Sequence, residues 1–161
     1  MATLRFHTEI RAPVTKVFDF VSQGENAPLW HASVKEAHHL TPPPIRLGTR
    51  LMMHALIGRK DYRWVQEVVT WDPPYRFTDR LTQATPSDGN VPTKAPFEEF
   101  EDRCVLAEKD GGTEMEFILH YQLPYGGLGR FLDWLFLRSR VRRDTEGSLR
   151  KLKGLMEAPP P

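Results

Sequence analysis

Residues 113–156 read TEMEFILHYQLPYGGLGRFLDWLFLRSRVRRDTEGSLRKLKGLM and change from a strand pattern to a helix pattern. As far as Leu123, apolar side chains alternate with polar ones, which is typical of a strand with one buried face. After the break at 124–127, helical spacing predicts one long helix from about Leu128 to Met156, roughly 40 Å at 1.5 Å per residue. The apolar face of a sheet needs one large cover, so we expect this helix to lie across it.

The predicted helix has an apolar face that is interrupted in its middle. Helical spacing places polar residues between two apolar ends of the same face. We therefore expect the helix to pack on the sheet at both ends and to present polar groups to the space beneath its middle. This face consists of Leu128, Phe131, Leu132, Leu135, Ser139, Arg142, Glu146, Leu149, Leu152 and Met156.

Upstream of this segment, the chain shows six further strand patterns and two short helix patterns. Pro13 suits a first helical turn, and apolar residues follow it at helical spacing until Gly24. A second short helix is predicted at 25–29. The consecutive prolines at 73–74 cannot donate to a ladder, so they separate two strands. The predicted strands are 4–10, 34–40, 50–57, 62–71, 76–82, 97–108 and 113–123.

Together these elements predict an α+β domain. We expect a curved antiparallel sheet of about seven strands, wrapped around the long C-terminal helix, with two short helices after the first strand. The length predicts a single domain over 1–157, followed by a short disordered, proline-rich tail at 158–161. Residues 84–96 contain three prolines and a glycine and predict a solvated loop. Whether this loop is a lid over a site stays open.

The composition excludes several classes of protein. Lys and Arg number 22 against 21 Asp and Glu, so the chain lacks the positive charge of a dedicated nucleic-acid-binding protein. The single cysteine, Cys104, cannot form an internal disulfide, and its apolar surroundings predict a small buried side chain. Nucleotide-binding and metal-ligand motifs are absent, so we expect no metal and no cofactor. The charged N-terminus does not resemble a signal peptide, which predicts a cytoplasmic protein.

Two carboxylates fall on apolar faces of predicted strands. Asp79 and Asp102 each lie between two apolar neighbours of the same strand face. A buried carboxylate needs a partner or a raised pKa, and such groups gather at functional sites. Arg142 and Glu146, from the polar middle of the helix, are the expected partners. The alternative is a bulge that turns both aspartates to solvent.

A second apolar stripe lies on another side of the predicted helix. It consists of Trp134, Leu137 and Val141, which lie amid several arginines. Such a stripe with a basic rim predicts contact with an anionic membrane surface or with a second subunit as a homodimer. The alternative is that loop 125–130 and the first two helices cover it.

The order of several short motifs resembles one known superfamily. These motifs are Ala12-Pro13-Val14, Val17-Phe18-Asp19-Phe20, Trp30-His31, Trp71-Asp72-Pro73-Pro74-Tyr75-Arg76-Phe77, Gly111-Gly112-Thr113 and Leu123-Pro124-Tyr125-Gly126-Gly127-Leu128-Gly129-Arg130. Over about Thr3 to Glu157 the sequence is similar to the START, polyketide cyclase and birch-pollen-allergen (SRPBCC) superfamily, and most similar to bacterial polyketide cyclase/dehydrase-like members. These members often carry paired histidines after a Gly-Pro-Phe segment. Here Glu101-Asp102-Arg103 takes their place, so the His-x-His acid/base pair is absent.

The resemblance implies a helix-grip fold with a hydrophobic cavity between sheet and helix. The superfamily includes lipid and hormone carriers, aromatic cyclases, quinone-binding proteins and chaperone-associated domains, so it implies no single activity. We expect a small hydrophobic or amphipathic ligand that is lipid-, polyketide- or quinone-like. The expected ligand-binding residues are Phe6, Trp30, Met53, Trp64, Phe77, Phe100, Phe117, Leu119, Tyr121 and Leu135, with Ser139 and Glu146 from the helix.

Two alternatives to a ligand carrier stay open. An enzyme would transfer protons in an aldol cyclisation or a dehydration, with Asp79 or Asp102 as general base and Tyr121 or Arg142 stabilising an enolate. A chaperone-type or regulatory interaction domain would have a filled core, so the volume of the cavity separates it from the other two. His31, next to an aromatic residue, is interpreted as a packed edge residue, with a place at a pocket mouth as the alternative.

Overall fold

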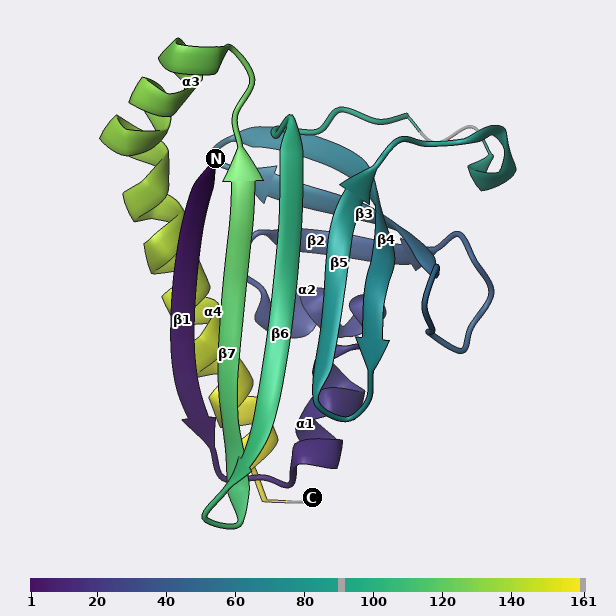
Figure 1. Cartoon of the computed structure of the whole chain (residues 1–161), viewed down its shortest axis with the longest axis vertical. Coiled ribbons are helices and arrows are strands. Elements are labelled where there is room, and N and C mark those ends of the chain that lie inside the picture. Colours follow the sequence, from purple (N-terminus) through teal and green to yellow (C-terminus); the bar gives the residue numbers. More distant parts are fainter. Residues whose placement is uncertain (90–91, 160–161) are drawn as a thin grey trace.

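The computed structural model describes residues 1–89 and 92–159, and it contains seven strands joined by short helices and closed by a long helix (Figure 1). Residues 90–91 of the expected loop and 160–161 of the expected tail lie outside the described residues. In chain order the elements are β1 (Ala2–Ile10), α1 (Val14–Val21), η1 (Gly24–Asn26), α2 (Ala27–Trp30), β2 (Val34–His39), β3 (Arg50–Ile57), β4 (Lys60–Asp72), β5 (Arg76–Thr82), η2 (Pro86–Asp88), β6 (Glu99–Lys109), β7 (Gly112–Gln122), α3 (Gly126–Leu132), η3 (Asp133–Leu137) and α4 (Arg138–Glu157).

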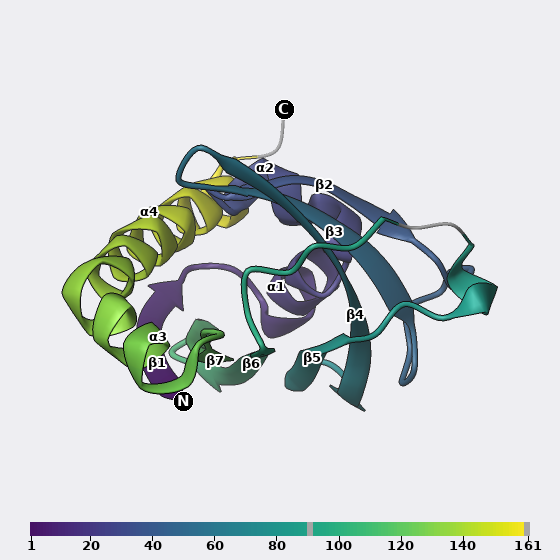
Figure 2. The same ribbon diagram turned by 90° about the horizontal axis from the view of Figure 1, so that it is seen from above.

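The strands form one antiparallel sheet in the order β1-β7-β6-β5-β4-β3-β2. Each strand from β2 to β7 pairs with its neighbour in the chain, and β1 joins the sheet by pairing with β7. Seen from above, the sheet curves around a helical layer made of α1, α2 and α4 (Figure 2). The predicted α+β helix-grip architecture, with about seven strands around the C-terminal helix, is therefore confirmed.

The main core lies between the curved sheet and the helices α1 and α4. Phe18 of α1 is fully buried, and its ring centroid lies 5.2 Å from that of Trp71 and 5.8 Å from that of Phe77. At the C-terminal end of α4, Leu149 and Leu152 pack into the same cluster. These apolar contacts fix the two helices against one end of the sheet. A smaller cluster lies on β2, β3 and β4.

A π-helical turn, η3, interrupts the long helix. The backbone N–H of Arg138 donates to the carbonyl of Asp133, a spacing of five residues where an α-helix has four. The extra residue rotates the preceding helix by about 100° relative to the regular α-helix that the sequence predicts. The prediction that the apolar face of the long helix is buried is confirmed at its C-terminal end, at Leu149, Leu152 and Met156. It is wrong for the rest of that face.

The exposed and buried sides of the helix near η3 differ from those expected. Leu137 and Val141, expected on the outer stripe, are half-buried and pack against the main core, whereas Trp134 stays exposed. Conversely, the side chains expected to face the sheet point to solvent. These exposed residues are Leu128, Phe131, Leu132, Leu135, Ser139, Arg142 and Glu146.

The segment after β5 is fastened to β3 by one arginine. Arg50 donates to both carboxylate oxygens of Asp88, at 2.9 and 2.7 Å, and also to Glu67. The ion pair with Arg50 holds the pKa of the Asp88 carboxyl well below its ordinary value. Further along, Lys94 pairs its backbone with that of Arg63. The described parts of the expected loop therefore contain a fixed turn, η2, and a bridge to the sheet.

Candidate functional site

A cavity of about 120 Å³ lies between the concave face of the sheet and the middle of the long helix. A dry apolar cavity of about 150 Å³ is large enough to hold benzene, so this one suits a single ring. The core is thus not filled as an interaction domain would predict. The cavity is lined by Val21, Gly24, Ala27, Trp30, His31, Ser33, Val34, Met53, Ala55, Ile57, Trp64, Gln66, Phe77, Asp79, Phe97, Phe100, Asp102, Cys104, Met115, Phe117, Leu119, Arg140, Val141, Asp144 and Thr145.

Aromatic rings form much of the cavity wall. Phe97 and Phe100 stack with centroids 5.0 Å apart, and Trp64 meets Phe100 edge-on at 6.2 Å. On the other side, Trp30 meets Phe117 edge-on at 6.1 Å. Because these rings hold one another in place, the wall is formed before any ligand arrives.

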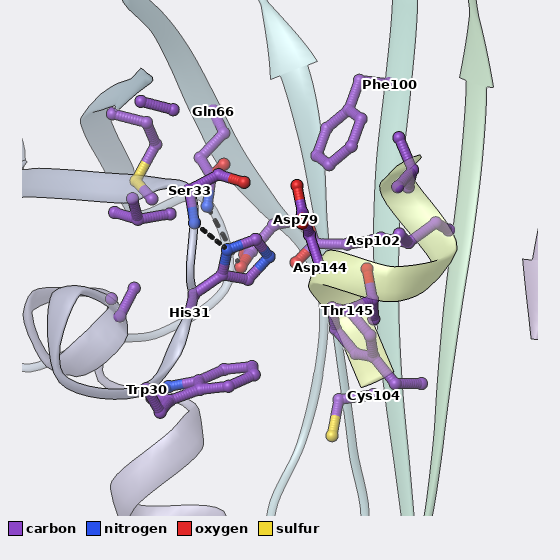
Figure 3. Close-up of a pocket in the computed structure, with 18 of the residues that line it drawn as sticks. Trp30, His31, Ser33, Gln66, Asp79, Phe100, Asp102, Cys104, Asp144 and Thr145 are labelled. Atoms are coloured by element: carbon purple, nitrogen blue, oxygen red, sulfur yellow. Dashed lines mark hydrogen bonds between the residues drawn. The ribbon is translucent and has the colours of Figure 1, made fainter. Parts of the chain in front are cut away.

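Two carboxyl groups face each other on the sheet side of the cavity (Figure 3). Asp79 of β5 and Asp102 of β6 are directly opposed in the sheet register, so their side chains leave the same face. Gln66 donates its amide to Asp79 Oδ2 at 3.3 Å and accepts from the Trp64 indole, also at 3.3 Å. Among the described residues, Oδ1 of each aspartate is buried and has no hydrogen-bond partner. Both aspartates face the cavity, and the alternative of a solvent-facing bulge is therefore not met.

The apolar surroundings change the acidity of this pair. Burial, with the nearby charge of Asp102, raises the pKa of Asp79 well above its ordinary value. Burial likewise raises the pKa of Asp102 to about 7. Ionising both of two opposed buried carboxyls costs free energy through like-charge repulsion, unless a cation lies between them. The pair therefore retains a proton near neutral pH and offers both a donor and acceptors to the cavity.

His31 lines the same cavity as the carboxyl pair (Figure 3). Its Nδ1 accepts a long hydrogen bond, 3.4 Å, from the backbone N–H of Ser33, and burial lowers its pKa to about 4. The imidazole is thus neutral at pH 7 and carries its proton on Nε2. The prediction of a packed edge residue was wrong, because His31 lines the cavity.

The long helix supplies a third wall through residues on its inward side. Thr145 is buried in the cavity wall. Arg140 is exposed and Asp144 is half-buried, and their Nε and Oδ2 atoms lie 3.8 Å apart where the cavity meets solvent. One turn further, Ser148 accepts a hydrogen bond from the backbone N–H of Ala32 at 2.8 Å. This bond fastens the helix to the segment that carries His31.

Most of the predicted ligand-binding residues on the strands line the cavity, as does Trp30 of α2. The predicted residues on the long C-terminal helix do not. Phe6, Arg142 and Glu146 line a separate surface groove between β1 and α4, where the Arg142 guanidinium lies 5.8 Å from the centre of the Phe6 ring. Arg142 and Glu146 are therefore not partners of the aspartates. The predicted residues that line the cavity are Trp30, Met53, Trp64, Phe77, Asp79, Phe100, Asp102, Phe117 and Leu119.

Two features of the long helix explain why its expected site residues lie elsewhere. The turn at η3 changes the helix phase, and Leu135 and Ser139 beside it are exposed. Within α4, the buried side runs through Thr145 and continues to Leu149 and Leu152. Arg142 and Glu146 therefore lie at the margin of that side, next to β1 instead of the cavity.

Tyr121 has a different place from the one expected. It is buried, and its hydroxyl donates to Asp133 Oδ1 at 2.5 Å, so it does not line the cavity. Burial and the hydrogen bond to Asp133 raise the pKa of the Tyr121 phenol. Arg138 holds the other oxygen of Asp133 at 3.2 Å. Tyr121 thus anchors η3 to the sheet.

Replacement of this anchor is expected to loosen the long helix. Tyr121→Phe leaves a buried carboxylate oxygen of Asp133 without its donor, which costs about 2 kcal/mol of unfolding free energy. Urea unfolding measures the loss, and hydrogen exchange should show faster opening of α3 and η3. Tyr125→Phe is the matched control, because Tyr125 is exposed. Equal stability of the two variants would show that Asp133 does not depend on Tyr121.

Sequence reasoning overlooked two kinds of cavity residue. Gln66 follows Trp64 on an apolar strand face, so the pattern that identified Asp79 was present for it as well. Asp144 and Thr145 were overlooked because the expected helix phase pointed other residues inward. Within the described residues, no group of three or more potential ligands is placed to hold a metal ion. None of the described helices has the length and apolar character needed to cross a bilayer.

A sheet that grips a long C-terminal helix over an apolar cavity defines a helix-grip protein of the START (SRPBCC) superfamily. Residues 1–157 match the family model described as "Polyketide cyclase / dehydrase and lipid transport", and the chain belongs to this family. Hydrophobic ligand binding and polyketide cyclase-type roles are both consistent with this family and fold. No curated protein matches the chain significantly.

Solved structures share the fold at low sequence identity. TTHA0849 from Thermus thermophilus is 20% identical with a TM-score of 0.74, and the alignment covers 94% of each chain. A START superfamily protein from Mycobacterium smegmatis is 17% identical with a TM-score of 0.71, over 96% of this chain and 97% of the other. The di-domain ARO/CYC BexL of the BE-7585A biosynthetic pathway is 19% identical with a TM-score of 0.70, over 99% of this chain and 51% of BexL.

Proposed function

We propose that this protein binds a small amphipathic molecule, of a lipid, polyketide or quinone-like class, in the cavity between sheet and long helix. The observation that carries the proposal is the pair of buried carboxyl oxygens, on Asp79 and Asp102, that face an aromatic cavity without a partner among the described residues. A buried polar atom without a hydrogen bond is costly, and a ligand with a matching polar group removes that cost.

The size of the cavity and the charge of its carboxyl pair restrict the kinds of ligand that can bind. A cavity of about 120 Å³ suits about one ring, so a longer ligand would extend toward solvent, where Arg140 is exposed. A neutral hydroxyl or carbonyl group complements a carboxyl pair that shares a proton. An anionic group would place a further negative charge beside Asp79 and Asp102 in an apolar site, so we expect it to be rejected.

Isothermal titration calorimetry with three compounds, each with a single ring and of similar length, tests this proposal. We expect 4-ethylphenol to bind about tenfold more tightly than ethylbenzene, because its hydroxyl meets the free oxygens of Asp79 or Asp102. We expect 4-ethylbenzoate to bind most weakly. Equal affinity for all three compounds, or preference for the benzoate, would contradict a polar subsite at the aspartates.

A second candidate function is proton-transfer catalysis by the carboxyl pair. It is favoured by the burial of two directly opposed carboxyls, which raises the pKa of Asp102 to about 7, because a general acid or base works best when its pKa is close to the working pH. Tyr121 and Arg142, the expected enolate-stabilising groups, lie outside the cavity lining. Ligand binding needs only the cavity, so we place it first.

A further inference from the structure

The first three turns of the long helix expose an unusual number of large apolar side chains. Trp134 is 68% exposed and Phe136 is 66% exposed, although both belong to residue types that are normally buried. Several large exposed apolar side chains within one short segment are rare on proteins without a partner surface. We call this the α3–η3 patch, and it consists of Tyr125, Leu128, Phe131, Leu132, Trp134, Leu135 and Phe136.

The patch lies at one end of the molecule. In Figure 1, α3 stands beyond the end of β7, far from the end that α1 closes, so no strand lies over its outer side. The view from above also places α3 at the outer margin, next to β1 and β7 (Figure 2). A flat surface can therefore reach the patch without meeting the rest of the sheet.

Positive charge surrounds the patch. Residues 125–143 contain five arginines and one acidic residue, Asp133. The five arginines are all exposed, whereas Asp133 is buried and bonded to Tyr121 and Arg138. Among the described residues, Arg138 pairs with Asp133 and Arg140 with Asp144, and the other three arginines add positive charge beside the apolar residues. The arginines are Arg130, Arg138, Arg140, Arg142 and Arg143.

We propose that the α3–η3 patch docks on an anionic membrane surface. Aromatic side chains such as Trp134 and Phe131 favour the boundary between headgroups and acyl chains, and arginines reach from it to lipid phosphates. Helical segments that combine exposed apolar and basic residues can bind at the membrane interface. A second copy of the chain fits less well, because a symmetric contact would bring five arginines against five arginines.

The docked segment continues directly into the wall of the cavity. Arg140 and Val141, in the first turn of α4, line the cavity just after the patch ends. Membrane docking would therefore place the solvent side of the cavity near the bilayer. Apart from Arg140, the residues on which docking rests lie outside the cavity lining, so docking can be tested separately from ligand binding.

Co-sedimentation of the full chain with vesicles tests the proposal. We expect binding to phosphatidylcholine vesicles that contain phosphatidylglycerol to exceed binding to pure phosphatidylcholine at least about tenfold at low salt, and to fall at high salt. Trp134 is far more exposed than the buried Trp30 and Trp64, so a blue shift of tryptophan emission should accompany binding.

Paired variants separate the two components of the surface. The double variant Trp134→Ala/Phe136→Ala and the double variant Arg130→Gln/Arg143→Gln should each lose most vesicle binding, about tenfold or more. Leu47→Ala removes a similarly exposed apolar side chain elsewhere and should leave binding unchanged. If the wild-type protein stays in the supernatant with anionic vesicles at low salt, the proposal is wrong. A concentration-dependent dimer that Trp134→Ala/Phe136→Ala abolishes would instead assign the patch to a second copy.

Discussion

At about pH 8, the Asp102→Asn variant is expected to be more stable than the wild-type protein by roughly 4 kcal/mol. Burial raises the pKa of Asp102 from its ordinary value of 3.8 to about 7, which corresponds to about 4 kcal/mol at full effect. Because the folded-state pKa is the higher one, the contribution to stability is fully present below about pH 4 and is lost as pH rises through about 7. The side chain of asparagine does not ionise, so the variant does not lose this stability as pH rises.

Urea unfolding of both proteins across this pH range measures the effect. His31 acts in the opposite direction, because burial lowers its pKa from 6.5 to about 4 and its contribution is lost as pH falls through that value. The prediction therefore concerns the difference between variant and wild type, in which the contribution of His31 cancels. Asp110→Asn, at an exposed turn, is the matched control and should change stability by less than about 0.5 kcal/mol. A difference that does not vary with pH would contradict a buried, proton-holding Asp102.

The same variant separates the two candidate functions. A binding protein keeps its affinity for ethylbenzene in Asp102→Asn, because the aromatic wall is unchanged. An enzyme that uses Asp102 as general base loses its proton transfer, which deuterium exchange at the α-carbon of a bound cyclic ketone reports. Exchange in the wild-type protein that survives the substitution would remove Asp102 from the catalytic assignment.

Ala55→Phe is expected to abolish binding of 4-ethylphenol, with a loss of affinity of about 100-fold or more. Ala55 is buried on β3 and lines the cavity, so a benzyl group at this position enters the space that we assign to the ligand ring. The cavity of about 120 Å³ has room for one ring only. Calorimetric titration measures the affinity of the variant.

Stability shows whether the new ring occupies an existing space. Filling a real cavity should change the unfolding free energy by less than about 1 kcal/mol, whereas forcing a ring into a packed core costs about 1–3 kcal/mol or more. Ala107→Phe, at an exposed position of β6, is the control for the substitution itself. Retained ligand affinity in folded Ala55→Phe would move the binding site away from this cavity.

The cavity residues on the strands could be predicted from the sequence, because successive side chains of a strand alternate between its two faces and this pattern is local. Phe77 and Asp79 lie two residues apart on β5, and the register with β6 places Asp102 directly opposite Asp79. Period-two patterning therefore put these side chains on the concave face before the pairing of strands was known. The same rule applied to Gln66, where it was not used.

The helix side of the site did not follow, because the phase of the helix depends on tertiary contacts. The buried bond from Tyr121 to Asp133 lies at the start of η3, where the helix takes up one extra residue. No local spacing rule predicts this turn, and every expected helix residue before it was placed on the wrong face. The cavity itself also arises from sheet curvature, which depends on all seven strands together.

The central claim is that the space between sheet and long helix is a ligand site with a polar end at Asp79 and Asp102. A crystal structure of the protein with 4-ethylphenol tests it most directly. We expect the hydroxyl within hydrogen-bonding distance of one of the two carboxyl groups, and the ring among Trp30, Trp64, Phe100 and Phe117. A cavity closed by side chains, with the compound bound elsewhere or not at all, would contradict the claim.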